Sequence, residues 1–284
     1  MLDKILDIVP ELPVAEWANR FTEWLTDTFA FLFNPIKVYF GDFMEFISDN
    51  LLLIPPLIII IIVALAAFFI GRKRIGLPIF SIIGLWFIYN QGLWDDLIST
   101  FTLVLLASIL SIVIGVPVGI LMAKSRIASV IITPILDLMQ TMPAFVYLIP
   151  AVAFFSIGMV PGIFASLIFA TPPTVRFTNL GIREVSGELV EAADAFGTTG
   201  AQKLFKVELP MAKSTIMAGI NQTVMLALSM VVIASMIGAP GLGRKVLSAL
   251  QRAEVGSGFV AGLGIVILAI IIDRMTQSIN QKKK

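Results

Sequence analysis

Cysteine and histidine are both absent from this 284-residue sequence. Because cysteine is missing, the chain can form no disulfide framework, zinc–thiolate site or thiol nucleophile. Because histidine is missing, it also lacks the usual general base and the commonest metal ligand. The remaining residues show no nucleophile–base set and no metal cluster, so we expect no catalytic residue and no metal site. An enzyme is therefore the least favoured class.

Charged residues are scarce as well. They make up 14% of the chain, whereas they make up about a quarter of a soluble domain. Hydrophobic residues make up 58%, and the mean hydropathy is +0.96. This composition indicates an integral membrane protein. We expect it to be all-α, with the lipid bilayer as its surroundings and no nucleic-acid partner.

Apolar stretches recur along the chain at lengths that suit a membrane. A bilayer core of about 30 Å needs roughly 20 apolar residues in helical conformation. Seven stretches qualify or come close: 51–70, 76–91, 97–123, 130–157, 162–181, 213–237 and 258–276. The second is short, and the fourth is long and interrupted by proline. The sequence therefore predicts about seven transmembrane helices.

The first 50 residues form an acidic leader. They hold nine acidic and three basic side chains, a net charge of 3 − 9 = −6, and no long apolar run. We therefore expect no cleaved signal peptide. Val14, Trp17, Phe21, Trp24 and Leu25 recur at helical spacing. They predict an amphipathic helix that either lies in the membrane interface or packs on the protein's own helices.

Lysine and arginine orient the spans, since they gather on the cytoplasmic side. Fourteen of them lie near the ends of the first, third, fifth and seventh spans, or in the loop after the fifth. Apart from the three basic residues of the acidic leader, only Arg244, Lys245 and Arg252 lie on the opposite side, between the sixth and seventh spans. We therefore expect the N-terminus, with its acidic leader, outside the cell. The basic tail, 277–284, would lie in the cytoplasm.

The loop after the fifth span, residues 183–212, is unusually polar for this chain. Its glutamates are spaced by four and three, so they share one face of a short helix. Gly197 should end that helix, because glycine readily adopts the left-handed αL conformation. A second short helix over 201–207 follows, and we expect it to end at Leu209-Pro210, where the chain re-enters the membrane.

The spacing in this loop resembles the EAA loop of ABC-importer permeases. That pattern is Glu-Ala-Ala, three residues, Gly, nine residues and then Ile-x-Leu-Pro. Seven residues match it or nearly so: Glu191, Ala192, Ala193, Gly197, Val207, Leu209 and Pro210. Only Val207 departs from the pattern, and valine keeps the β-branched shape of isoleucine. The resemblance implies that these residues form coupling helices that dock into a cleft on an ATP-hydrolysing subunit.

The resemblance extends over residues 97–276, which look like the five-helix core of a type I permease. Within it, 136–150 and 238–243 are similar to glycine betaine/proline betaine permeases of the OpuA/ProU type. Two extra spans within 51–92 and the acidic leader, 1–50, also fit that branch. The resemblance implies a permease of the bacterial cytoplasmic (inner) membrane. It would carry a quaternary-ammonium osmoprotectant delivered by an extracytoplasmic substrate-binding protein.

Such a permease would work with other chains. The sequence has no G-x-x-x-x-G-K-[ST] phosphate-binding loop, so we expect no cofactor on this chain and place ATP and Mg²⁺ on a separate ATPase subunit. Five core helices form half a pathway, so we expect a homodimer that moves solute by alternating access. The motifs Gly115-x-x-x-Gly119 and Gly258-x-x-x-Gly262 allow close helix approach, mostly for packing within one chain.

Polar residues inside spans are costly and are candidates for function by default. They are Asp137, Gln140, Thr141, Asn179, Asn221, Gln222 and Thr223. A salt bridge between Asp137 and Arg176 is conceivable, because adjacent antiparallel spans bring their cytoplasmic halves together. Pro143 lacks an amide hydrogen and should bend its helix. Phe145 and Tyr147 offer aromatic faces that attract a quaternary ammonium, although packing is the alternative for both rings.

We therefore predict a solute pathway with six candidate residues: Gln140, Thr141, Pro143, Phe145, Tyr147 and Asn221. Three other functions stay open at this point. The permease could carry choline, carnitine or another small solute, the chain could be a carrier that needs no ATPase, or it could be a structural membrane subunit. The resemblance to the EAA loop favours the ATP-driven permease.

Overall fold

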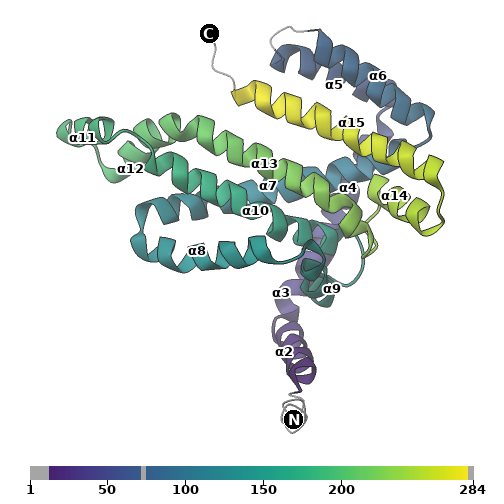
Figure 1. Cartoon of the computed structure of the whole chain (residues 1–284), viewed down its shortest axis with the longest axis horizontal. Helices are drawn as coiled ribbons and strands as arrows, with labels where there is room; N and C mark the ends of the chain where they lie inside the picture. Colours follow the sequence, from purple (N-terminus) through teal and green to yellow (C-terminus); the bar gives the residue numbers. More distant parts are fainter. Residues whose placement is uncertain (1–12, 72–74, 281–284) are drawn as a thin grey trace, which may run out of the picture.

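The computed structural model describes residues 13–71 and 75–280, and every regular element in these ranges is a helix (Figure 1). Three long helices pack side by side at the centre: α7 (Trp94–Lys124), α10 (Met159–Arg183) and α13 (Leu209–Ser235). The helix α15 (Val255–Asn280) packs against α13, and α8 (Arg126–Thr141) lies on the other side of α10. This arrangement confirms the expected all-α fold.

Two further apolar helices lie at the edge of the bundle. They are α5 (Pro56–Ile70) and α6 (Gly76–Asn90), which pack against each other and against α15. Figure 1 shows this pair on the side of α15 away from α13. They correspond to the two accessory spans that the sequence predicts.

Small residues let the central helices approach closely. A Cβ atom at Gly115 would lie 2.8 Å from Thr174 Cγ2, and one at Gly119 would lie 2.6 Å from Thr178 Cβ. These glycines of α7 therefore make room for α10, which confirms packing within one chain for this motif. Between α10 and α13, the hydroxyl groups of Thr174 and Thr223 are hydrogen-bonded at 2.7 Å.

Length and hydropathy do not confirm the count of seven spans. Three helices in the described part of the chain are long and apolar enough to cross a membrane: 94–124, 200–235 and 255–278. The number rises to as many as five if each of two bent helix pairs forms one span. The helix α6 is apolar but shorter, and α10 is absent from this set although it has 25 residues. Because α7 and α13 cover α10, it can carry buried threonines and prolines that would be costly against lipid.

The predicted span 130–157 is interrupted, as its prolines indicate. The structure divides it into α8 and α9 (Leu148–Phe155), joined through the 3₁₀ turn η2 (Ala144–Tyr147) and bent by 111°. The predicted bend at Pro143 is confirmed. Met142 and Pro143 are extended, because proline disfavours helical geometry in the residue before it.

The acidic leader folds into four helical segments. These are α2 (Val14–Thr28), α3 (Ala30–Pro35), the π-helix η1 (Ile36–Phe40) and α4 (Gly41–Leu53). The chain then turns by 98° into α5. Residues 51–53 therefore complete the leader rather than begin the first span, because Pro55 and Pro56 interrupt the helix after Leu53.

The two halves of the leader differ in how closely they pack on the bundle. Its second half packs on the bundle: Phe33 stacks on Phe154 at 4.7 Å, and Ser48 donates a hydrogen bond to Thr102 at 3.2 Å. In α2, by contrast, Trp17 and Trp24 are more than half exposed. Figure 1 shows α2 projecting away from the bundle, at the end opposite α11.

A helix that the sequence did not predict lies between α13 and α15. This is α14 (Leu242–Gln251), which begins after Gly241 at a φ of 113°. The Leu242 side chain is fully buried, and its backbone N–H donates to Thr100 Oγ1 at 2.8 Å. The segment 238–257 is therefore part of the packed structure rather than a plain connection.

Candidate functional site

The polar loop after α10 begins with α11 (Gly187–Ala195), which ends as predicted. Gly197 has a φ of 73° and lies just beyond the last turn. The N–H of Gly197 donates to the Asp194 carbonyl at 2.9 Å, and the N–H of Thr198 donates to the Ala193 carbonyl at 3.2 Å. This pair of bonds is the Schellman motif, which requires left-handed backbone at the glycine.

The second half of the loop is continuous with α13. The helix α12 (Gly200–Lys203) starts with a capping box, in which Thr199 and Gln202 each accept a hydrogen bond from the other's backbone. The π-helix η3 (Leu204–Glu208) then leads into α13, giving one helix over 200–235. The prediction that Leu209-Pro210 ends the second helix is therefore wrong. Pro210 lies in the first turn of α13, directly after the wide turn of η3, where a missing N–H is tolerated.

The loop is attached firmly to the bundle. Leu204 and Leu209 pack against a buried cluster formed by Ile182, Ala212 and Ile216. Glu208 is the residue between Val207 and Leu209 of the motif, and its side chain is only 5% exposed. It forms an ion pair with Lys124 at the end of α7. An unpaired carboxylate would be costly at this depth, so the pair fixes the loop to a long central helix.

The outer surface of the loop is uncovered and partly apolar. Glu191 and Ala192 are exposed, whereas Ala193 is buried inside the loop, so only one of the two alanines can meet another surface. Phe196 is 89% exposed and Phe205 is 67% exposed. Two uncovered phenylalanines beside polar residues form a surface suited to another protein. The motif did not predict that these phenylalanines would matter, because both occupy positions at which the pattern accepts any residue.

A second polar feature runs along α8. Asp137 forms an ion pair with Arg176 of α10, as the sequence suggested. Gln140 and Thr141 follow within about one turn and are exposed on the same side of the helix. The structure therefore places Gln140 and Thr141 of the predicted pathway on the same side of α8 as Asp137, which pairs with Arg176.

The aromatic residues of the predicted pathway separate in the structure. Pro143 is exposed at the bend, and Phe145 is 55% exposed. Tyr147, however, is only 3% exposed, and its ring meets Phe169 edge-on at 5.9 Å. Its hydroxyl group donates to the Met139 carbonyl of α8. Tyr147 therefore stabilises the bend after α8. In this conformation a solute cannot reach its ring, because the ring is buried.

Asn221 lies apart from the other predicted pathway residues. Its amide donates to Asp273 of α15 at 2.9 Å. Thr223, two residues further on and so on nearly the opposite side of α13, bonds to α10. Asn221 therefore links α13 with α15 and does not join the polar residues of α8.

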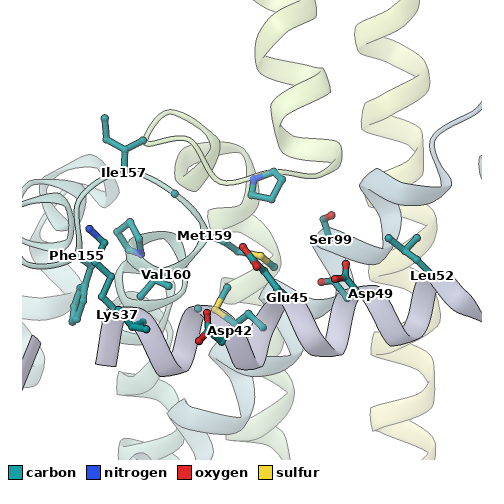
Figure 2. A pocket seen from close by; sticks show the side chains of 17 residues that line it. Lys37, Asp42, Glu45, Asp49, Leu52, Ser99, Phe155, Ile157, Met159 and Val160 are labelled. Atoms are coloured by element: carbon teal, nitrogen blue, oxygen red, sulfur yellow. The ribbon is translucent and has the colours of Figure 1, made fainter. Parts of the chain in front are cut away.

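A groove opens at the end of the bundle opposite α11 and α12. It has a volume of about 560 Å³ and lies between α4 and the segment before α10. Figure 2 shows Asp42, Glu45 and Asp49 along one side of α4, with Ser99 and Met159 across from them. Near one end of the groove, Lys37 donates to Ser156 Oγ at 2.8 Å. The lining of this groove therefore carries more acidic than basic side chains.

The fold and the site define a class of protein. It is a helical membrane bundle with an ordered polar loop at one end, and its sequence contains no nucleotide-binding loop. Residues 115–284 match the family described as binding-protein-dependent transport system inner membrane component. The chain belongs to this family of ABC-importer permeases.

Curated relatives match almost the whole chain. It is 58% identical to the glycine betaine/carnitine transport permease protein GbuB of Listeria monocytogenes, over 97% of this chain and 98% of that protein. It is 51% identical to the glycine betaine transport system permease protein OpuAB of Bacillus subtilis, over 98% of each. It is 45% identical to the glycine betaine/proline betaine permease protein ProW of Escherichia coli, over 96% of this chain and 77% of ProW.

Solved structures show the same fold. The chain is similar to a chain of the MetNI methionine ABC transporter in inward-facing conformations, with a TM-score of 0.55 and 23% identity. The match covers 64% of this chain and 93% of the other. A second crystal form of that transporter gives a TM-score of 0.56 at 24% identity.

Proposed function

We propose that this chain is the membrane-spanning subunit of an ATP-driven importer for a quaternary-ammonium osmoprotectant, either glycine betaine or proline betaine. The ordered loop with exposed Phe196 and Phe205 carries the proposal, since it offers another protein a surface that is tied to a central helix through Lys124 and Glu208. The similarity to GbuB, OpuAB and ProW, which are glycine betaine permeases, supports the solute.

Three partners follow from this function. An ABC ATPase that holds ATP and Mg²⁺ docks on Glu191, Ala192, Phe196 and Phe205. A substrate-binding protein approaches the opposite end, where the acidic groove lies. A second copy of the chain completes the pathway, because five core helices enclose only half of it. The family description supports dependence on a binding protein.

The distribution of charge supports the orientation. Lysine and arginine are concentrated toward the end that carries α11 and α12, so this end faces the cytoplasm. The leader and the groove then lie outside, with the N-terminus. We propose the same division of the chain as before: leader 1–50, accessory spans within 51–92, core 97–276 with coupling loop 183–212, and tail 277–284.

The mechanism is alternating access. Closure of the ATPase dimer moves the coupling loop, and because α12 and η3 continue into α13, the loop moves that helix with it. Since Glu208 holds Lys124 of α7, the same motion reaches a second central helix. The pathway between two copies then opens to one side of the membrane at a time.

Reconstitution tests the proposal. The permease, a candidate ATPase that co-purifies with it, and the binding protein are placed in proteoliposomes. We expect uptake of radiolabelled glycine betaine that requires ATP, with ATP hydrolysis stimulated by the solute. Competition by unlabelled proline betaine, carnitine or choline distinguishes the solutes. Uptake that persists without the ATPase would instead establish an independent carrier.

A further inference from the structure

The helix α8 has three distinct sides. Leu136, with Ile132 and Met139 beside it, packs against α7 and α10. A second side is apolar and uncovered, with Ile131 and Leu138 both more than half exposed. Between these two sides lies a polar stripe formed by five residues: Ser129, Thr133, Asp137, Gln140 and Thr141.

Exposing the polar stripe to lipid would be unfavourable in free energy. Ser129, Thr133, Asp137 and Thr141 are spaced by four residues, and Gln140 lies three residues after Asp137, so the stripe stays on one side of the helix. Asp137, Gln140 and Thr141 are exposed, so no other part of the described chain covers them. Polar groups at membrane depth face a bundle interior or a water-filled cavity. The stripe therefore faces the water-filled pathway between two copies.

The Asp137–Arg176 pair lies deep along this stripe. Asp137 is 11 residues from the start of α8 and Arg176 is seven from the end of α10, or about 16 Å and about 10 Å of helix from the loop end. Among the described residues, no other ion pair joins two spans away from their ends. Both side chains stay accessible, at 57% for Asp137 and 39% for Arg176.

We propose that Asp137 and Arg176 form a transient binding site for a zwitterionic solute, and this inference rests on the proposed function. A betaine carries one carboxylate and one quaternary ammonium. Its carboxylate can take the place of Asp137 at the guanidinium of Arg176, which offers a planar set of donors. Its ammonium can then lie against the freed carboxylate of Asp137. Both charges of the protein remain compensated throughout.

The accessible pair is suited to opening. An ion pair in contact with water is worth only about 0–1 kcal/mol, so a solute with both charges can separate it. The Arg176 side chain is 39% exposed, so an incoming carboxylate can reach the guanidinium group beside Asp137. A cation without a carboxylate would leave Arg176 uncompensated. The pair therefore favours zwitterions over simple cations.

Charge-neutralising variants test the site in the reconstituted complex. Asp137→Asn removes one charge at nearly constant size, and Arg176→Gln removes one charge but keeps a polar amide on a shorter side chain. We expect each to lower the maximal rate of glycine betaine uptake at least tenfold. ATP hydrolysis stimulated by the loaded binding protein should stay within about twofold of the wild type. Arg176→Lys keeps the charge and should recover part of the uptake.

The double variant Asp137→Asn with Arg176→Gln separates solute binding from a structural role. If the pair only balances charge between α8 and α10, two neutral amides would restore uptake. We expect uptake to stay low, because the solute then meets no charge. Asp273→Asn alters a carboxylate of α15 that forms no ion pair with any basic residue in the described part of the chain. It serves as the control and should transport within about threefold of wild type.

The outcomes separate this site from the overall function. If the wild-type complex takes up no betaine, the proposed function itself is wrong. If the wild type transports and either single variant transports at the same rate, the binding site is wrong. Recovery of uptake in the double variant would also overturn it.

Discussion

At the scale of single residues, Gly197 shows how the backbone can set a requirement that side-chain packing does not. A Cβ atom at this position would meet nothing within 4 Å, yet the φ of 73° is one that other residues rarely adopt. A substitution would therefore cost about 1–3 kcal/mol through backbone strain alone, and more for a β-branched residue.

We expect Gly197→Val to leave membrane insertion intact but to reduce betaine uptake about tenfold per ATP hydrolysed, because the turn between α11 and α12 is distorted. Gly200→Ala is the matched control. It lies in the same loop with the same free space but without a positive φ, so it should behave like the wild type. Normal coupling in Gly197→Val would mean that this turn does not transmit motion.

Residue-level prediction succeeded where the signal was local. Gly197 at a helix end and Pro143 at a bend follow from backbone chemistry, and both are confirmed. The ring of Tyr147 could not be placed in the same way. Its burial depends on Phe169, which is 22 positions away and reaches it only through the fold of α9 and α10.

At the scale of elements, the attachment of the loop depends on a contact between residues 84 positions apart. Lys124 and Glu208 come from the end of α7 and the last position of η3. If Lys124 lost its charge, Glu208 would be a nearly buried carboxylate with no ion-pair partner in the described part of the chain. The cost is about 1–3 kcal/mol, moderated because Lys124 remains 39% exposed.

Lys124→Gln should therefore lower the unfolding temperature of the purified permease by several degrees and weaken coupling between ATP hydrolysis and uptake. The exchange Lys124→Glu with Glu208→Lys keeps the pair and should restore much of both. Asp194→Asn, in the Asp194–Lys203 pair of the same loop, should change the unfolding temperature little. Thermal unfolding in detergent followed by fluorescence measures all three. An unchanged Lys124→Gln protein would show that the pair does not fasten the loop.

Element boundaries were predicted well where apolar runs and helices coincide and poorly elsewhere. The ranges of α6, α7 and α15 agree with the predicted spans to within about four residues. The start of α5 was misplaced, although Pro55-Pro56 signals the break. The helix α14 was missed because its segment is short and polar, and its position depends on a hydrogen bond to Thr100.

At the scale of the whole molecule, one copy leaves the polar stripe of α8 uncovered. We therefore expect two permease copies in the assembled transporter. With a chain mass of 30.9 kDa, two copies contribute 2 × 30.9 = 61.8 kDa. Light scattering on the detergent-solubilised complex, corrected for detergent, can measure this contribution. One copy per complex would leave the pathway half-enclosed and would contradict the proposed arrangement.

The continuous helix over 200–235 has a mechanical consequence. Its 36 residues span about 54 Å, so it acts as a rigid lever that reaches from the coupling loop to the far side of the membrane. Tilting such a rod by about 5° about one end moves the other end by about 5 Å, close to one helical turn. Small movements of an ATPase can thus become gate-sized displacements at the outer end without any hinge inside the membrane.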